Sequence, residues 1–469
     1  MSTSRRILKN IFSLSIAEVA NKGIVFITTA YLARVIGLDK FGIISFANSV
    51  LLYFLLFSNL GFNIVGIRET ARKPDQVNNY ASQITTYRLI LSFISCFAMM
   101  IFALIIDKPI EVKILIIIST INLVSNAFLM DWVYQGAEKM GVLALRQVIT
   151  SGINLIGYLL FVHSPSDVIL ALVITVTSTF LNSLWMFILF NKMYGKIRLF
   201  IDTKMMKELL SSSIPIMFSN FFITIYNSMN IVMLGFMKSD SETGIYSAAF
   251  KFVGLTIAPS AIINIAFFPL VARAESEEQK ARALKVYSKG LYFVGSILTF
   301  IICIFASYFI KFTYGSDYLS SIPVLQVLML TVLIMYMNTA YYPPLVAWKK
   351  EKIVMYAIGA GAVINIILNL ILIPLYGAMG AAWSTVFSEL GVFFGLIFLI
   401  KKEINSTYIF NLFYAIIIAG LASSSGYLFN RYLHIHEIVA SIIAFITFCI
   451  LLFVFKITNV TEIKGYLSK

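Results

Sequence analysis

Six charged residues lie inside long apolar stretches, where a charge is costly unless it is paired or hydrated: Glu18, Lys22, Arg88, Asp131, Lys251 and Glu389. Glu389 lies near the middle of its stretch, beyond the reach of either end, so it must pair, protonate or meet water. Lys251 lies about 10 Å from the end of its own stretch and has the opposite charge. Either the two residues pair directly, or Lys251 holds an anionic group while Glu389 accepts a coupling proton or cation. The sequence leaves both open, and we favour separate roles.

The other four charges also allow two interpretations each. Glu18 and Lys22 are four residues apart, so they share a helix face and either form a structural ion pair or line a polar path. Arg88 lies only about 9 Å inside its stretch, so it either reaches lipid headgroups or faces the path. Asp131 lies near the end of its stretch, and we expect it to pair with a basic neighbour or to take part in coupling.

Three arginines follow the ends of apolar stretches that an internal repeat makes equivalent: Arg68, Arg72 and Arg273. The guanidinium fork suits phosphate oxygens, which it binds with two parallel hydrogen bonds. Anchoring at the membrane surface is the competing explanation for these residues. Together with Arg88, Lys22 and Lys251, they are the candidate contacts for an anionic substrate.

The sequence carries no enzyme signature. The segment from Gly290 to Gly295 resembles a phosphate-binding loop in its glycines, but Ser296 follows where a Lys-Ser/Thr pair is required. His434 and His436 are two residues apart, on different helix faces, so we predict no metal site and no resident cofactor. We also predict no catalytic residues.

The elements that position these residues are membrane helices. Of the 469 residues, 59% are hydrophobic and 12% charged, and the apolar runs are each long enough to cross a bilayer core of about 30 Å. The runs predict an all-α polytopic membrane protein of about 14 helices, near residues 11–36, 41–66, 82–106, 112–135, 142–162, 167–191, 209–237, 244–271, 288–312, 322–347, 353–374, 378–400, 408–429 and 436–456.

Positive charge is distributed unevenly among the connectors. The net charge is +14, and alternate connectors collect 26 of the 36 Lys and Arg residues, against eight on the other side. Because positive residues concentrate on the cytoplasmic side, both termini are predicted to be cytoplasmic. The same rule explains the charge without nucleic-acid binding, which we exclude.

Short motifs recur after about six helices. Gly42-Ile43-Ile44-Ser45 corresponds to Gly244-Ile245-Tyr246-Ser247, Glu138-Lys139 to Glu351-Lys352, and Asn154 to Asn365. An even number of helices makes the two halves parallel, which is a transporter plan with the substrate path between the lobes. The predicted organisation is a six-helix lobe over 1–207, a second over 208–402, and two extra helices over 403–469.

Several stretches resemble Wzx-type polysaccharide flippases, within the exporter superfamily that includes multidrug and toxin extrusion (MATE) antiporters. The resemblance rests on three segments, Tyr31–Gly37, Asp131–Lys139 and Gly244–Lys251, and on Gly61-Phe62-Asn63 with Arg68-Glu69. Ala30 and Asn59 depart from the proline and the acidic residue expected in this family.

The resemblance implies a MATE-like fold and alternating access without ATP, driven by H⁺, Na⁺ or the membrane potential. The implied substrate is an undecaprenyl-diphosphate-linked oligosaccharide, carried from the cytoplasmic to the outer leaflet of the bacterial inner membrane for O-antigen or another surface polysaccharide. Membrane lipid, and possible contact with a polysaccharide polymerase complex, are the expected partners of a monomer. The alternatives are a lipid II flippase of peptidoglycan synthesis and a MATE-type cation-coupled drug antiporter. A glycosyl polymerase or ligase is disfavoured because no external connector could hold a catalytic domain.

Overall fold

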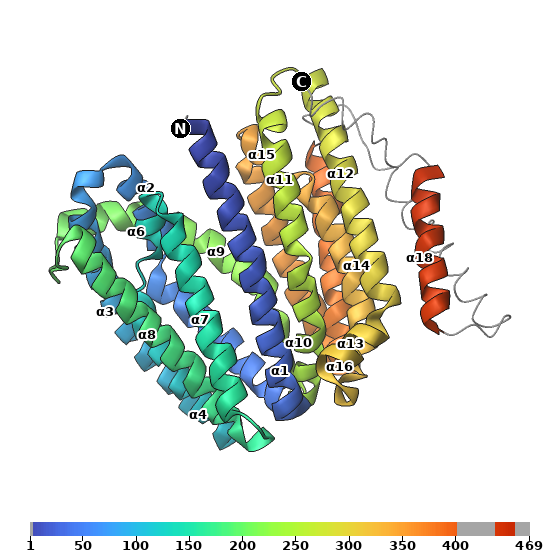
Figure 1. The fold of residues 1–469 in the computed structure, drawn as a ribbon, viewed down its shortest axis with the longest axis horizontal. Coiled ribbons are helices and arrows are strands. Elements are labelled where there is room, and N and C mark those ends of the chain that lie inside the picture. The colour runs from blue at the N-terminus through green and yellow to red at the C-terminus, as the bar shows by residue number, and fades with distance from the viewer. Residues whose placement is uncertain (1–2, 401–436, 455–469) are drawn as a thin grey trace. The chain divides into compact units, whose positions relative to one another are not determined.

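The computed structural model describes residues 3–400 and 437–454, and all regular structure in these ranges is helical. The chain divides into two compact units, Met1–Gly244 and Ile245–Lys469 (Figure 1). The helix predicted over 408–429 lies outside the described residues. The helix predicted over 436–456 corresponds to α18 (Glu437–Val454).

The described part of the first unit contains long helices interrupted by short ones. Its elements are α1 (Thr3–Asn59), α2 (Phe62–Arg72), α3 (Val77–Ile105), α4 (Ile110–Ser119), α5 (Ile121–Ala127), α6 (Asp131–Gly136), α7 (Met140–Phe161), α8 (Val168–Tyr194) and α9 (Thr203–Met237). Helix α1 packs against α3, α7 and α9, so it is the central element of this unit.

The second unit follows the same plan. Its elements are α10 (Asp240–Leu255, beginning in the first unit), α11 (Ile257–Ala272), α12 (Glu277–Ile304), α13 (Ala306–Tyr314), α14 (Ser321–Thr339), α15 (Tyr342–Ala347), α16 (Glu351–Ile400) and α18. Helix α14 packs between α12 and α16.

Ten helical segments of the described residues are long and apolar enough to cross a membrane. Two of them, of 39 and 48 residues, are far longer than one crossing requires. Each bends at a glycine with positive φ, Gly37 at 76° and Gly377 at 57°, a conformation that a side chain disfavours. Each therefore supplies two crossings, as the sequence predicts for 11–66 and 353–400.

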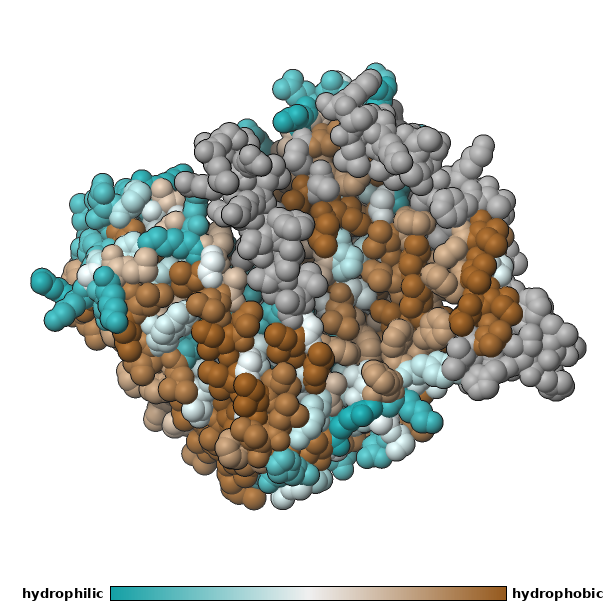
Figure 2. Space-filling view, viewed as in Figure 1, coloured by the Kyte–Doolittle hydropathy of each residue, from teal (hydrophilic) through white to brown (hydrophobic). Residues whose placement is uncertain are grey.

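Hydrophobic side chains cover the flanks of the helices in both units, and hydrophilic ones gather at helix ends (Figure 2). On α3, for example, Phe93, Phe97 and Leu104 are 62%, 68% and 67% exposed. An apolar surface this extensive is stable only in contact with lipid. The predicted all-α polytopic membrane fold is confirmed.

The repeat is visible in the backbone at an offset of 211 residues. Helix α6 corresponds to α15, both six residues long. Each is followed by a residue with positive φ, Glu138 at 56° and Lys349 at 59°. The next amide closes the turn in both, from Lys139 to Tyr134 O (2.8 Å) and from Lys350 to Leu345 O (2.7 Å). The equivalent of Glu138-Lys139 is therefore Lys349-Lys350, two residues before the pair that the motif comparison suggests.

The packing of the helices and the internal repeat divide the chain at different positions. Helix α9, with which the repeat begins its second lobe, packs against α1 and α2 of the first unit. The division at 207/208 concerns the repeat and stays a prediction.

Candidate functional site

Two of the predicted substrate arginines lie on α2. Arg68 and Arg72 are both exposed and four residues apart, so they share a helix face. Arg68 Nε lies 2.9 Å from Glu69 Oε1, an exposed pair that contributes little stability. Directly after α2, the Lys73 ammonium donates to the Tyr80 hydroxyl at 3.1 Å, a bond that raises the pKa of Lys73. The end of α2 is therefore a cationic surface.

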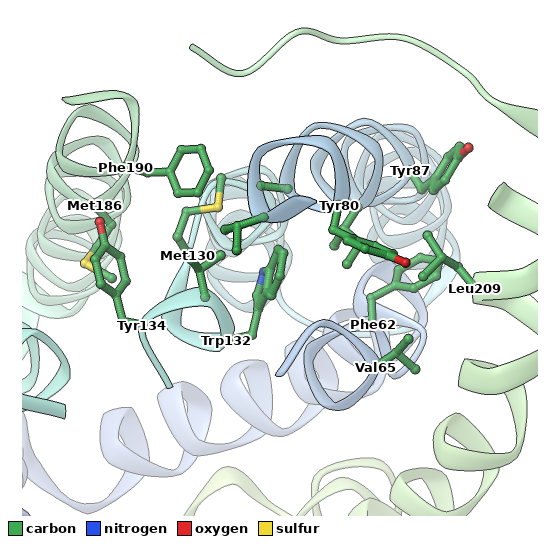
Figure 3. Packing of buried hydrophobic residues seen from close by; sticks show 14 of the residues in the cluster. Phe62, Val65, Tyr80, Tyr87, Met130, Trp132, Tyr134, Met186, Phe190 and Leu209 are labelled. Carbon is green, nitrogen blue, oxygen red and sulfur yellow. The ribbon is translucent and has the colours of Figure 1, made fainter. Parts of the chain in front are cut away.

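Helix α2 is positioned by close packing on α6. A side chain at Gly66 would lie 2.4 Å from Trp132 Cε3, and one at Gly136 would lie 2.7 Å from Thr70 Cβ. Only glycine allows such an approach. Trp132 is 1% exposed and lies in the middle of an aromatic cluster shared by α2, α3, α6 and α8 (Figure 3). The stretch Asp131–Lys139, which carries the family resemblance, thus fixes the helix that bears the arginines.

Arg273 lies in the second unit, just after α11, and is exposed. With Arg282 of α12 it lines a cavity of about 220 Å³, whose other walls are Leu270, Ala274, Gln279 and Ala283. Two guanidinium groups at one cavity can bind an oxyanion.

Arg88 lies in the protein interior, 1% exposed on α3. Its Nη1 donates to Leu129 O at 3.1 Å, and its Nη2 donates to the carbonyl and the side-chain Oδ1 of Asn126. It therefore does not reach out to headgroups, although the sequence allows that. Its hydrogen bonds go to Asn126 near the end of α5 and to Leu129 between α5 and α6.

Asp131 begins α6 and pairs with Arg146 of α7, with Nη2 and Oδ2 2.8 Å apart. The charge of Arg88 also acts on Asp131. Arg146 is a residue that the sequence reasoning missed. Arg146 can reach Asp131 because the chain turns between α6 and α7, at Glu138 with its positive φ. The sequence does not predict that turn.

Glu389 is 3% exposed in α16. Asn338 of α14 donates its amide nitrogen to Glu389 Oε2 at 2.5 Å and to the main-chain oxygen at 3.3 Å. Asn338, also missed from the sequence, is a donor to this buried carboxylate.

Lys251 of α10 is exposed and forms no ion pair with any described residue, so it does not pair with Glu389. Lys22 is half-buried in α1. The side chain of Glu18 lies outside the described residues, and its pairing with Lys22 stays a prediction.

A polar seam joins α7 to α8. Thr150, Asn154 and Tyr158 are spaced by four residues on α7, and each bonds a polar side chain of α8. The partners are Asn182 for Thr150, Ser178 for Asn154 (2.6 Å) and Thr175 for Tyr158 (2.5 Å). In the second unit, Asn365 donates to Ser388 (3.4 Å) at nearly the same repeat offset. Interhelical bonding, the default explanation for these asparagines, accounts for the contacts.

Among the described residues, no group of three His, Cys, Asp or Glu side chains could hold a metal ion. The polar groups of the site are cations at helix ends and single buried charges with hydrogen-bond partners. Such an arrangement suits the binding of an anion.

Fold and site together define a multi-pass membrane transporter. A family model described as "Polysaccharide biosynthesis protein" matches residues 7–275, and one described as MatE matches 215–371. The first match covers more than half of the chain, which therefore belongs to the polysaccharide biosynthesis protein family. This confirms the resemblance noted in the sequence.

Curated relatives and solved structures agree with this assignment. A protein of Shigella dysenteriae named "Putative O-antigen transporter" is 26% identical, over 81% of this chain and 96% of its own length. An Escherichia coli protein of the same name is 21% identical, over 83% and 95%. The structure of "Lipid II flippase MurJ" superposes with a TM-score of 0.76 at 15% identity, over 95% of this chain and 99% of that one. The structure of an inward-facing MATE transporter superposes with a TM-score of 0.65 at 15% identity, over 81% of this chain and 95% of that one.

The separation of Glu389 from Lys251 is testable by charge exchange. Glu389→Lys should destabilise the protein by about 3 kcal/mol, because it buries a cation without an acceptor. Lys251→Glu places a charge of opposite sign on a membrane helix and should also destabilise the protein, by about 1 kcal/mol. Because the residues are not in contact, the double variant should show no recovery beyond the sum of the two single effects. The measurement is thermal unfolding in detergent.

The matched control is the Asp131–Arg146 pair. Asp131→Arg combined with Arg146→Asp should recover about 1 kcal/mol relative to the sum of the single changes. A comparable recovery for Glu389 with Lys251 would contradict the separation.

Proposed function

We propose that the protein is a flippase that moves an undecaprenyl-diphosphate-linked oligosaccharide repeat unit from the cytoplasmic to the outer leaflet, for O-antigen or another surface polysaccharide. The observation that carries the proposal is the likeness to O-antigen transporter relatives over 95–96% of their length. The exposed arginines on α2 and after α11 suit it, since the diphosphate is the charged part of such a substrate.

The proposed cycle is alternating access by two lobes. Arg68, Arg72 and Arg273 capture the diphosphate at the cytoplasmic leaflet, and Lys251 and Lys22 are the further cations of the path. Glu389 exchanges a proton or Na⁺, with the membrane potential as another driving force. The protein acts as a monomer in the bacterial inner membrane, and a polysaccharide polymerase complex takes its product.

Two other transport functions are found in proteins with the same fold. The likeness to the lipid II flippase extends over nearly the whole chain, but at 15% identity it supports only a shared fold. A MATE-type antiporter should carry acidic groups without balancing cations, and Arg88 and Lys251 argue against that.

The substrate is tested by deleting the gene. The lipid-linked repeat unit of a surface polysaccharide should accumulate at the cytoplasmic leaflet, with loss of that polysaccharide from the cell surface. Accumulation of lipid II would favour the peptidoglycan alternative, and accumulation of neither would contradict both flippase assignments.

Replacing Arg68, Arg72 or Arg273 by Lys keeps the charge but removes the bidentate fork. Each change should lower surface polysaccharide about tenfold at equal protein level, corresponding to one lost charge-assisted hydrogen bond of about 1.5 kcal/mol. Arg198, exposed on the connector between α8 and α9, is the matched control, and Arg198→Lys should have no effect. Full activity of all three test variants would leave membrane anchoring as their role.

The proposed orientation has both termini in the cytoplasm. Ser276 and Asp317 are exposed at opposite ends of the α12–α13 segment. Cysteines placed there should react with an impermeant reagent from opposite sides, position 317 from outside. Labelling of both from the same side would refute this topology.

A further inference from the structure

The fourth membrane segment of the chain is broken twice. Helix α4 ends at Ser119, α5 covers Ile121–Ala127, and three non-helical residues separate α5 from α6. We call residues 128–130 the α5–α6 gap. Because lipid offers no hydrogen-bond donors, a break is tolerated only where other groups of the protein satisfy the backbone.

Helix α3 supplies those donors along one face. Cys96 bonds Thr120 O at the first break (3.3 Å), and Ser92 bonds Leu123 O within α5 (2.8 Å). Arg88, one turn further, bonds Leu129 O inside the gap and Asn126 O just before it. The spacing of four residues keeps the three side chains in one row.

Arg88 is the charged member of this row and the one at the gap. At 1% exposure, with both terminal nitrogens of its guanidinium bonded to the α5–α6 region, it is committed to the protein interior. It therefore differs from Arg68 and Arg72, which are exposed.

The gap determines where α6 begins. Helix α6 presents Trp132 and Gly136 to α2, and the contacts at Gly66 and Thr70 leave no room for a shift. The end of α2 carries Arg68 and Arg72. A continuous series of contacts thus leads from Arg88 through the gap and α6 to the exposed arginines.

We propose that Arg88 is a positioning residue: by bonding the α5–α6 gap it holds α6 against α2 and so sets the arginines that capture the diphosphate. The proposal rests on the proposed function for the identity of the substrate. It assigns Arg88 no contact with that substrate. The counterpart in the second unit, the break between α14 and α15, is bonded by a neutral donor, Tyr287 to Thr339 O at 3.4 Å.

The first measurement needs no substrate. Hydrogen exchange of the full-length protein in nanodiscs should be at least about tenfold faster over 62–72 and 131–136 in Arg88→Gln. Ser92→Ala removes a bond from the same row but not from the gap, and should leave both segments unchanged. Equal protection in Arg88→Gln and the native protein would overturn the proposal, whatever the transport data show.

The second measurement uses reconstituted vesicles and undecaprenyl diphosphate bearing a fluorescent disaccharide. Arg88→Gln should raise the half-saturating substrate concentration about tenfold, with the maximal rate within about twofold. Arg88→Lys, which keeps one donor toward the gap, should recover part of this. Since Arg88 acts through α2, the double variant Arg88→Gln with Arg72→Lys should bind substrate little more weakly than Arg72→Lys alone.

The outcomes distinguish a failure of the positioning role of Arg88 from a failure of the proposed flippase function. A fall in maximal rate alone, or losses that add fully with Arg72→Lys, would overturn the positioning role. Faster exchange of α2 and α6 in a protein whose native form moves no lipid-linked saccharide would support the positioning role and refute the proposed function. If Arg88→Gln does not fold, both measurements are made on Arg88→Lys. The same changes are then expected, but smaller.

Discussion

Lipid cannot hydrogen-bond a peptide group, and the irregular parts of this protein depend on that constraint. A membrane segment may break only where another helix offers donors. Three of the described breaks illustrate this rule: Cys96 and Arg88 face the breaks on either side of α5, and Tyr287 faces the one after α14. Helices α3 and α12, which carry these donors, therefore determine where their neighbours can bend.

The breaks in turn create the elements that present the site. The breaks before α6 and α15 each yield a six-residue helix, and these pack against α2, which carries Arg68 and Arg72, and α11, which Arg273 follows. In the first unit the contact is Trp132 on Gly66, and in the second Trp348 Nε1 donates to Val271 O at 3.1 Å. The two tryptophans occupy different repeat positions, so the two units achieve the same docking with different residues.

The sequence predicts the membrane helices well because hydropathy and loop charge are properties of each stretch by itself. It also predicts the parallel repeat and, through the Asp131–Lys139 motif, the family. The breaks within 112–135 and 322–347 are not predictable in this way, since they depend on donors from another helix. For the same reason, the depth of Arg88 suggests a headgroup contact, while its partners 38 and 41 residues away hold it inside. Likewise, only the folded chain brings Arg146 to Asp131 and Asn338 to Glu389.

The two buried charges of the described residues, Arg88 in the first unit and Glu389 in the second, have opposite signs, which bears on how the proposed transport can work. In the first unit, Arg88 lies near the Asp131–Arg146 pair, and these three described residues together carry one excess positive charge. In the second, Glu389 lies buried against the neutral donor Asn338, apart from the exposed Lys251. A buried carboxylate can change its charge by taking a proton or a cation, because burial disfavours its charged form. An arginine remains charged throughout. In the proposed transport cycle, Arg88 therefore keeps its charge throughout, while Glu389 is the group whose charge is proposed to alternate.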